Sequence, residues 1–444
     1  MQSRSALSIV ATAVLGLAPV VPAPAVAEIS KVTVNSTQDI GPFHGKSYRQ
    51  VEATLEGKAS GGEYSVPVTM AFPTNPADAS GVAVVDVVNT VTIGKEQWVI
   101  GGRVLPVARI HMGDDFLFGA GRSYIAPLWD KTAVEALKTG SIAAPADGYT
   151  IIADAAELAR NAAKYMPDGP PAATTTIAYG FSQSGSVLRG WHADRYNTRS
   201  GRPVFEGSIL GGDGGACRDL VAQKRKACPG VVADGGKVMV FATETDVETG
   251  GFADRGEGSD YRVIEVAGVS HIPASAADFR QHGLPEQNPV DFGPALRAAL
   301  VNMEGWIKGA EPPANALIEL SDDSARNVQG MPFREAKRDA DGNALGGLRL
   351  PHLPTTLANG EHVGAPVGSY NGLAWKHENG NFFFLISGSF ESFPATKLQT
   401  LYPSQEAYVR SVAAAADELV RLRQILPEDA QAYVQTAQAK GLTR

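Results

Sequence analysis

The stretch that decides the fold is AYGFSQSG, residues 178–185. A run rich in β-branched residues precedes and overlaps it at 174–179 (TTTIAY), and a helical pattern follows it. A strand that turns directly into a helix leaves little room for side chains, and small residues flank Ser182, with Gly180 before it and Ser184 after it. The pattern therefore predicts a sharp strand-to-helix turn with Ser182 at its tip.

This layout is that of a nucleophile elbow, G-x-S-x-G, in which the serine hydroxyl attacks a carbonyl carbon. Ser184 replaces the second glycine, but a small residue still meets the steric requirement. Ser182 is the predicted nucleophile. Gln183 is predicted to give one backbone N–H to the oxyanion hole, where the helix dipole also favours negative charge. The second donor is expected from Asn89 or Thr90, in the loop after an apolar strand.

Outside the elbow, short β-branched runs alternate with helical patterns, which favours an α/β fold with a mostly parallel sheet covered by helices. Looser alternation over 47–55 and 64–72, with two glycines between, predicts an antiparallel hairpin. A helix over 149–163 is expected to lead into the elbow strand. The predicted parallel strands are residues 82–88, 174–179, 205–210, 237–242 and 261–267, of which 205–210 has the weakest pattern.

The residues downstream of the elbow follow the order that a serine triad on this architecture requires: an acid after one later strand and a histidine after the last strand. His271 follows the strand at 261–267. It is therefore the predicted general base, which takes the Ser182 proton and later returns it to the leaving group. The other histidines do not follow a strand in this way.

Three carboxylates are candidates for the acid. Asp246 stands after the strand at 237–242, where the acid of such a triad is usually found. Glu244 is nearer the strand and has a longer side chain, and Asp213 lies in the glycine-rich loop after 205–210. The sequence favours Asp246 over Glu244 by a narrow margin and leaves Asp213 as the third possibility.

The two ends of the chain have patterns of their own. Residues 1–27 contain Arg4, an apolar run and then AVA at 25–27, which predicts a signal peptide cut near Ala27 and a secreted or periplasmic protein. The remainder is expected to form a core over 28–310 and a C-terminal extension over 311–444 that packs on the core. The extension begins with an irregular segment rich in Pro and Gly, at about 310–370, that runs over the surface or over the active site. It ends in two predicted helices, 404–426 and 427–440.

Cys217 and Cys228, with ten residues between them, are the only cysteines. In an exported protein they are expected to form a disulfide, with two buried thiols as the alternative. A metal site is not expected, because no histidine or further cysteine lies nearby at ligand spacing.

The composition, with 44% hydrophobic and 19% charged residues, is that of a globular protein. The net charge of −8 disfavours nucleic acid as a partner. After residue 27 no stretch is long and apolar enough to cross a bilayer, so stable membrane insertion is not expected.

The chain resembles the bacterial and fungal "alpha/beta hydrolase domain-containing" proteins, which are large secreted or periplasmic hydrolases. The resemblance implies the α/β-hydrolase fold and a Ser–acid–His hydrolase of esters without metal or organic cofactor, with Ser182, His271 and an acid in the 244–246 loop. The chain departs from the family pattern after Asn89, where TV stands in place of Arg-Gly. The similar blocks are VVDVVNT (84–90), GFSQSGSVLR (180–189), YNTRSGRPVFEG (196–207), TETDV (243–247), VIEVAGVSH (263–271) and the tail from 401 to 430.

The leading functional hypothesis is a carboxylic-ester hydrolase that works through an acyl-enzyme on Ser182, on a small-molecule or polymer ester. An amidase or peptidase is the nearest alternative, because the same triad cleaves both kinds of bond. A catalytically inactive binding protein with the same fold is the alternative from another class.

Overall fold

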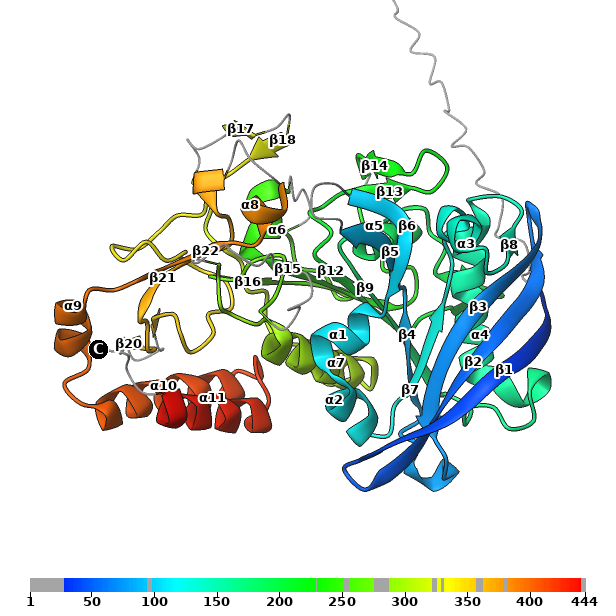
Figure 1. Cartoon of the computed structure of the whole chain (residues 1–444), viewed down its shortest axis with the longest axis horizontal. Helices are drawn as coiled ribbons and strands as arrows, with labels where there is room; N and C mark the ends of the chain where they lie inside the picture. The colour runs from blue at the N-terminus through cyan, green and yellow to red at the C-terminus, as the bar shows by residue number, and fades with distance from the viewer. Residues whose placement is uncertain are drawn as a thin grey trace, which may run out of the picture.

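The computed structural model describes residues 28–93, 98–228, 230–250, 255–274, 287–321, 326–328, 331–356, 362–377 and 382–440. The predicted signal peptide, residues 1–27, lies outside the described residues. Ten strands of the described residues form one central sheet in the order β1-β2-β3-β7-β4-β9-β12-β15-β16, with β8 beside β3 (Figure 1). These strands are β1 (Glu28–Phe43), β2 (Lys46–Ala59), β3 (Gly62–Pro73), β4 (Val82–Asp86), β7 (Ser123–Pro127), β8 (Ser141–Ile142), β9 (Thr175–Phe181), β12 (Gly207–Gly211), β15 (Lys237–Thr243) and β16 (Tyr261–Val266).

From β7 to β16 all neighbouring strands pair in parallel, whereas β1, β2, β3 and β7 pair antiparallel. The prediction of a mostly parallel sheet is therefore confirmed. Every residue of β4, β9 and β12 is buried, as expected for strands covered on both faces. The strand predicted at 205–210 begins at Gly207 instead, because the backbone N–H and carbonyl of Phe205 both hydrogen-bond to the Asn197 side chain and not to a neighbouring strand.

The predicted antiparallel hairpin is formed by β2 and β3, which turn at Ser60 and Gly61. Strand β1 was not predicted. It lies at the edge of the sheet, and only Ile29 and Val32 of its side chains are buried, so the sequence lacks the alternation of apolar and polar residues that marks a half-buried strand.

Helices cover both faces of the sheet (Figure 1). Helix α4 (Asp147–Tyr165) and helix α5 (Gln183–Ala193) share one face, where the rings of Tyr149 and Trp191 lie 5.6 Å apart. Helices α1 (Val107–Met112), α2 (Asp114–Gly119) and α7 (Gly293–Ile307) cover the opposite face, to which Tyr179 of β9 points its hydroxyl. The remaining helices are α3 (Lys131–Leu137), α6 (Glu244–Thr249), α8 (Phe382–Ile386), α9 (Ala395–Leu401), α10 (Gln405–Arg421) and α11 (Pro427–Lys440), with 3₁₀ turns at Pro76–Asp78 and Trp375–His377.

The predicted disulfide is present. Cys217 and Cys228 are bonded, with their Cα atoms 5.3 Å apart, and they join the two ends of a short hairpin. In the described part of the chain, six two-stranded ribbons lie outside the central sheet, and the disulfide closes the third of them. They are β5 (Asn89–Ile93) with β6 (Trp98–Leu105), β10 (Thr198–Arg199) with β11 (Arg202–Pro203), β13 (Cys217–Asp219) with β14 (Lys224–Lys226), β17 (Arg326–Val328) with β18 (Met331–Phe333), β19 (Thr355–Thr356) with β20 (His362–Val363), and β21 (Gly368–Asn371) with β22 (Ser389–Ser392).

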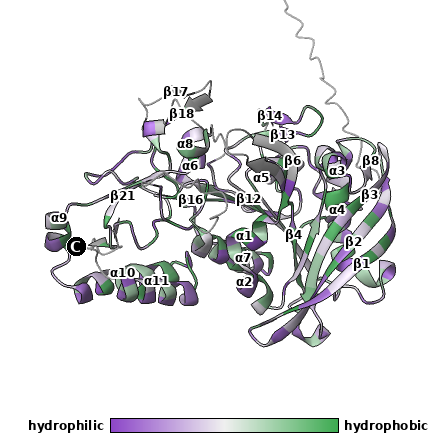
Figure 2. Cartoon of the chain, in the orientation of Figure 1, coloured by the Kyte–Doolittle hydropathy of each residue, from purple (hydrophilic) through white to green (hydrophobic). Residues whose placement is uncertain are grey.

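The C-terminal part of the chain packs against the edge of the sheet at β16. Ala316 and Leu348 each pair with this edge strand through backbone hydrogen bonds, which covers an otherwise open strand edge. The chain then ends in α10 and α11, along which hydrophobic and hydrophilic residues alternate (Figure 2). Both predicted tail helices are present, although the first ends at Arg421 and not at residue 426, and Arg297 of α7 is paired with Asp429 of α11.

Candidate active site

The order of the strands creates a crevice between β4 and β9. After β4 the chain crosses to β7 on one side, and it later returns to β9 on the other side. In open α/β sheets, ligands bind outside the carboxyl ends of the strands at such a reversal. Ser182 follows the last residue of β9 directly, and Asn89 stands three residues after β4. Both therefore lie at this crevice.

Ser182 occupies the tip of a tight turn. Its backbone has φ 58° and ψ −111°, a conformation that a residue with a side chain rarely adopts, and α5 begins at the next residue. A Cβ atom added to Gly185 would lie 2.1 Å from the carbonyl oxygen of Gly211, and one on Gly180 would lie 2.7 Å from the backbone of Ser184. The small residues of the elbow are thus required by the close approach of neighbouring backbone.

Ser184, which replaces the second glycine of the strict motif, has a structural use of its own. Its Oγ accepts a hydrogen bond from the N–H of Phe181 at 2.9 Å, and its own N–H donates to Asn89 Oδ1 at 3.0 Å. The side chain is fully buried. Ser184 therefore joins the two ends of the turn, and it also connects the turn to the loop that follows β4.

The structure brings three of the predicted residues together. His271 Nε2 lies 3.0 Å from Ser182 Oγ, and His271 Nδ1 lies 2.6 Å from Asp246 Oδ1. Asp246 comes from α6, after β15, and His271 comes from the loop after β16. The Ser182 hydroxyl, the imidazole and the carboxylate thus form one hydrogen-bonded chain across the carboxyl ends of β9, β15 and β16.

Asp246 is held in an arrangement that keeps it ionised. Its Oδ2 accepts hydrogen bonds from the Thr243 N–H at 2.9 Å and the Thr243 hydroxyl at 2.7 Å. The Asp246 N–H donates in turn to Thr243 Oγ1 at 3.3 Å, and the two backbone N–H bonds form a capping box at the start of α6. Burial by itself would raise the pKa of Asp246, but the attraction of His271 and the hydrogen bonds from His271 and Thr243 outweigh it and lower the pKa below its ordinary value. The carboxylate can therefore orient a protonated His271 and stabilise its charge.

The other two candidate acids are paired elsewhere. Glu244 accepts hydrogen bonds from the N–H of Gly268 and the side chain of Arg338. Asp213 forms a buried ion pair with Arg189 at 2.8 Å. Of the three carboxylates predicted from the sequence, the structure brings Asp246 to the imidazole.

The side chain of Gln183 binds one of the backbone N–H groups that were predicted for the oxyanion hole. Its Oε1 accepts the backbone N–H of Thr90 at 2.8 Å, and its Nε2 donates to Thr90 Oγ1 at 2.8 Å. The Thr90 N–H is thus engaged by a side chain, which leaves Asn89 as the candidate for the second backbone donor. Gln183 is the first residue of α5, where the N–H groups lack acceptors within the helix.

Asp130 completes this small network and was not predicted. It accepts a hydrogen bond from Thr90 Oγ1 at 2.7 Å, and it also caps α3 through the N–H of Thr132 at 2.9 Å. An aspartate immediately before a helical pattern is a capping signal that the sequence offered. Its second contact is with Thr90, which lies 40 positions earlier in the sequence, and it could not be predicted without knowing the fold.

A layer of buried polar groups lies behind the elbow. The ring of His111 packs 4.5 Å from that of Phe181, whose centroid lies 5.0 Å from that of His271. Burial and the nearby charge of His271 lower the pKa of His111 to about 3, so the His111 ring is neutral. His111 donates to or accepts from the Tyr179 hydroxyl at 2.7 Å. It therefore supports the site from behind and does not reach Ser182.

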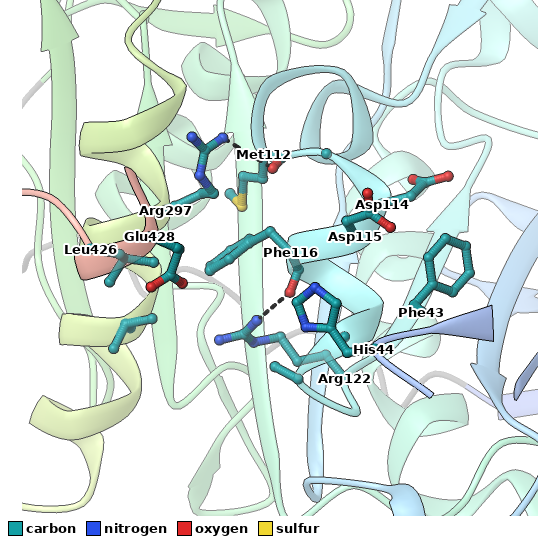
Figure 3. A pocket seen from close by; sticks show the side chains of 14 residues that line it. Phe43, His44, Met112, Asp114, Asp115, Phe116, Arg122, Arg297, Leu426 and Glu428 are labelled. Atoms are coloured by element: carbon teal, nitrogen blue, oxygen red, sulfur yellow. Dashed lines mark hydrogen bonds between the residues drawn. The ribbon is translucent and has the colours of Figure 1, made fainter. Parts of the chain in front are cut away.

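A pocket of about 760 Å³ lies away from these residues, between the β1–β2 turn, α2, α7 and the start of α11 (Figure 3). Its walls include Phe43, Phe116, Arg122 and Arg297. None of the predicted site residues lines it.

Neither a metal-binding cluster nor a membrane-spanning helix occurs among the described residues. In this part of the chain, His, Cys, Asp and Glu side chains do not gather in threes in a way that could hold a metal ion. Likewise, none of its helices is both long and apolar enough to cross a membrane. The absence of a metal or organic cofactor stays a prediction.

Comparisons with solved structures give remote matches. A rice cell wall degrading esterase, LipA, from Xanthomonas oryzae is 14% identical, with a TM-score of 0.29, over 40% of this chain and 49% of that one, so the match spans about half of the esterase. A glucuronoyl esterase from Solibacter usitatus is 14% identical, with a TM-score of 0.30, over 48% of this chain and 68% of that one. A feruloyl esterase B from Aspergillus oryzae is 11% identical, with a TM-score of 0.24, over 41% and 34%.

No curated protein sequence matches the chain. A family model does match it, with the description "Alpha/beta hydrolase domain", over residues 124–435, which is well over half of the chain. The matched region contains β9 with the elbow, β15, β16, the loop of His271 and the helical tail. The sheet order and the elbow geometry described above agree with this match. The chain belongs to the alpha/beta hydrolase domain family.

Proposed function

We propose that the protein is a serine hydrolase that cleaves carboxylic esters through an acyl-enzyme on Ser182. The observation that carries the proposal is the hydrogen-bonded chain from Ser182 Oγ through His271 to Asp246, with distances of 3.0 and 2.6 Å. These lengths are within the reach that proton transfer between nucleophile and base requires. The strained backbone of Ser182 supports the proposal, because such strain is concentrated at functional sites.

The reaction follows from the roles of these groups. His271 Nε2 takes the proton of the Ser182 hydroxyl while Oγ attacks the ester carbonyl carbon, and Asp246 stabilises the resulting imidazolium. The N–H groups of Gln183 and Asn89 would stabilise the negative oxygen of the tetrahedral intermediate, with a contribution of about 3 kcal/mol per donor. His271 then protonates the leaving alcohol, and the acyl-enzyme remains. Water, deprotonated by His271, releases the acid and restores Ser182.

The test of this proposal compares p-nitrophenyl esters of increasing acyl length with the matching p-nitroanilides. We expect the wild-type protein to release nitrophenol, and Ser182→Ala to lose all but a residual rate. Ser411→Ala serves as the control, because this serine hydroxyl only hydrogen-bonds the carbonyl of Ala407 within α10. Faster cleavage of anilides than of esters would favour an amidase, and equal rates for wild type and Ser182→Ala would contradict the proposal.

We also propose that the protein is exported and processed near Ala27. The disulfide between Cys217 and Cys228 supports this proposal, because such bonds persist in oxidising compartments. N-terminal sequencing of protein recovered from the extracytoplasmic fraction should begin at or near residue 28. Recovery of the intact N-terminus from the cytoplasm would contradict it.

A further inference from the structure

Two buried glutamates on the helix that carries Asp246 meet a single cation from the C-terminal part of the chain. Glu244 and Glu248 are both fully buried. Arg338 Nη2 donates to Glu244 Oε1 at 2.8 Å and to Glu248 Oε1 at 3.0 Å. One guanidinium nitrogen therefore serves two carboxylates, and the ion pairs join α6 to a segment about 90 residues further along the chain.

Glu244 extends this connection to the loop of His271. Its Oε2 accepts the N–H of Gly268 at 2.7 Å, three residues before His271, where the backbone turns through φ +67°. Its Oε1 accepts the N–H of Gly372 at 2.9 Å. The same carboxylate thus contacts the loop of the general base, the cation and a second point of the C-terminal extension.

Thr245 provides a second connection that does not pass through Arg338. Its hydroxyl oxygen accepts the backbone N–H of His271 at 3.0 Å, and the hydroxyl donates to the carbonyl of Gly372. The extension approaches α6 so closely here that a Cβ atom on Gly372 would lie 2.5 Å from the Thr245 nitrogen. The backbone of His271 is therefore linked to the extension through one threonine side chain.

The positive charge of Arg338 explains why the contacts of Glu244 depend on it. Burial would lower the pKa of Arg338, but the charges of Glu244 and Glu248 raise it, so the guanidinium stays protonated. Even beside this cation, burial and the charge of Glu244 raise the pKa of Glu248 to about 8. Without it, the buried Glu244 carboxylate would lose its counter-charge and would move toward water. That movement would weaken the acceptor that holds Gly268 and, through it, the His271 loop.

We propose that Arg338 and Thr245 are positioning residues for the triad, through which the C-terminal extension fixes His271 against Ser182 and Asp246. This inference rests on the proposed function. Neither side chain touches the reacting atoms, so their loss should misplace the imidazole and slow the chemical step more than it weakens substrate binding.

The test measures kcat and KM for a p-nitrophenyl ester in Arg338→Met and Arg338→Lys. The Met variant should lose at least tenfold in kcat with KM changed less than twofold. Lysine should recover most of the rate, because both contacts use the single atom Nη2 and one ammonium can replace it. Arg421→Met is the matched control, since Arg421 belongs to the same extension and pairs with Glu418 within it. Its kcat should stay within twofold of wild type.

Thr245→Val provides the second variant, with Thr249→Val as its control on the same helix. The Thr249 hydroxyl donates to the carbonyl of Thr245 one turn earlier. Valine at 245 should lower kcat and the rate of labelling by a fluorophosphonate probe by a similar factor, whereas valine at 249 should change neither. Thermal unfolding of each variant verifies that it is folded at the assay temperature, and Thr245→Val decides the question if Arg338→Met does not fold.

The outcomes separate the two proposals. If Arg338→Met is folded and keeps the wild-type kcat, the positioning role is wrong while the proposed function stands. If Arg338→Met does not fold, the same conclusion follows from a folded Thr245→Val that keeps the wild-type kcat. If lysine at 338 restores nothing although the protein is folded, the cation is not the effective group and the inference about Arg338 fails. If wild type neither cleaves esters nor reacts with the probe, the proposed function fails, and the positioning role fails with it.

Discussion

Ser182 has a backbone conformation that costs a non-glycine residue on the order of 1–3 kcal/mol. Two backbone hydrogen bonds hold it there: its N–H donates to Gly211 at 2.9 Å, and its carbonyl accepts from Ser186 at 3.0 Å. The strain keeps the hydroxyl outside both the strand and the helix, where His271 can reach it. At this scale the candidate site depends on one strained residue and on the imidazole aligned with it.

The choice among the acids gives a residue-scale prediction. Asp246→Asn should lower kcat by about four orders of magnitude, because the amide favours the wrong tautomer of His271 and cannot stabilise its charge. Glu244→Gln should lower kcat less and should also reduce the unfolding temperature, because Glu244 is buried against Arg338. Steady-state kinetics and thermal unfolding of both variants check this. A larger loss of kcat in Glu244→Gln than in Asp246→Asn would contradict it.

Sequence reasoning reached the types and order of the site residues but could not settle every choice among them. Ser182 and His271 could be predicted because each follows a strand, β9 and β16 respectively, in a way that few other residues of their type do. Glu244 and Asp246 occupy one loop, and what separates them is the capping box, in which Thr243 turns the Asp246 side chain toward His271. The contacts of Arg338 have a sequence separation of about 90 residues, and no local pattern indicates them.

At the scale of elements, the elbow depends on how closely α5 approaches the neighbouring strand. The position of Gly185 leaves no space for a methyl group, since the carbonyl oxygen of Gly211 lies 2.1 Å from where Cβ would be. Gly211 accepts the N–H of Ser182, and Gly185 lies in the first turn of α5, so a shift of either residue would displace Ser182.

Gly185→Ala should therefore destabilise the protein by about 1–3 kcal/mol, the usual cost of overpacking. The helical Gly305 in α7 offers a matched control, because the nearest atom to an added Cβ lies at an ordinary 3.6 Å. Gly305→Ala should leave stability unchanged or raise it by up to about 1 kcal/mol through helix propensity. Denaturant unfolding of the two variants tests the comparison, and equal stabilities would contradict the steric account.

The disulfide gives a second prediction at this scale. Replacing Cys217 and Cys228 together with alanine should lower the free energy of unfolding by about 3 kcal/mol, because the bond closes a short loop and limits the unfolded chain. A reducing agent should lower the unfolding midpoint of wild type but not that of the double variant. An unchanged midpoint of wild type under reduction would show that the bond does not stabilise the fold.

The elements that sequence reasoning missed have a common physical cause. Strand β1 is an exposed edge strand, and most of its side chains face solvent. The extension contacts β16 at single residues such as Ala316 and Leu348, and these isolated bridges leave no periodic pattern. Buried strands such as β4 and β9 were predicted because burial on both faces demands continuous apolar runs.

At the scale of the whole molecule, the C-terminal extension and the core are joined by ion pairs as well as by hydrophobic packing. Arg297 of α7 pairs with Asp429 of α11, and Arg338 pairs with Glu244 and Glu248 of α6. Buried acids elsewhere in the core have pKa values far from ordinary. Burial raises the pKa of Asp86, at the end of β4, from 3.8 to about 7, although the N–H of Ala108 and the Tyr124 hydroxyl donate to it.

The Asp86 pKa predicts how stability depends on pH. A carboxyl group that binds its proton more tightly in the folded than in the unfolded state stabilises the fold fully below its unfolded pKa of about 4. This contribution is lost as the pH rises through about 7. The free energy of unfolding of wild type should therefore fall between pH 5 and 7, by up to about 1.4 kcal/mol per pH unit more than that of Asp86→Asn.

The asparagine variant is a suitable comparison because it keeps one oxygen for the Ala108 and Tyr124 donors and does not titrate in this range. Urea unfolding at several pH values between 5 and 8 gives the two slopes. Parallel slopes for wild type and variant would mean that Asp86 does not hold its proton in the folded protein.

The most direct test of the central claim is to locate the covalent adduct after reaction with a fluorophosphonate ester analogue. Tandem mass spectrometry of the peptide that contains the elbow can distinguish Ser182 from Ser184 and Ser186. The account predicts a single adduct on Ser182 that appears as esterase activity is lost, and that is absent from His271→Ala. An adduct on another residue, or full inactivation with Ser182 unmodified, would contradict it.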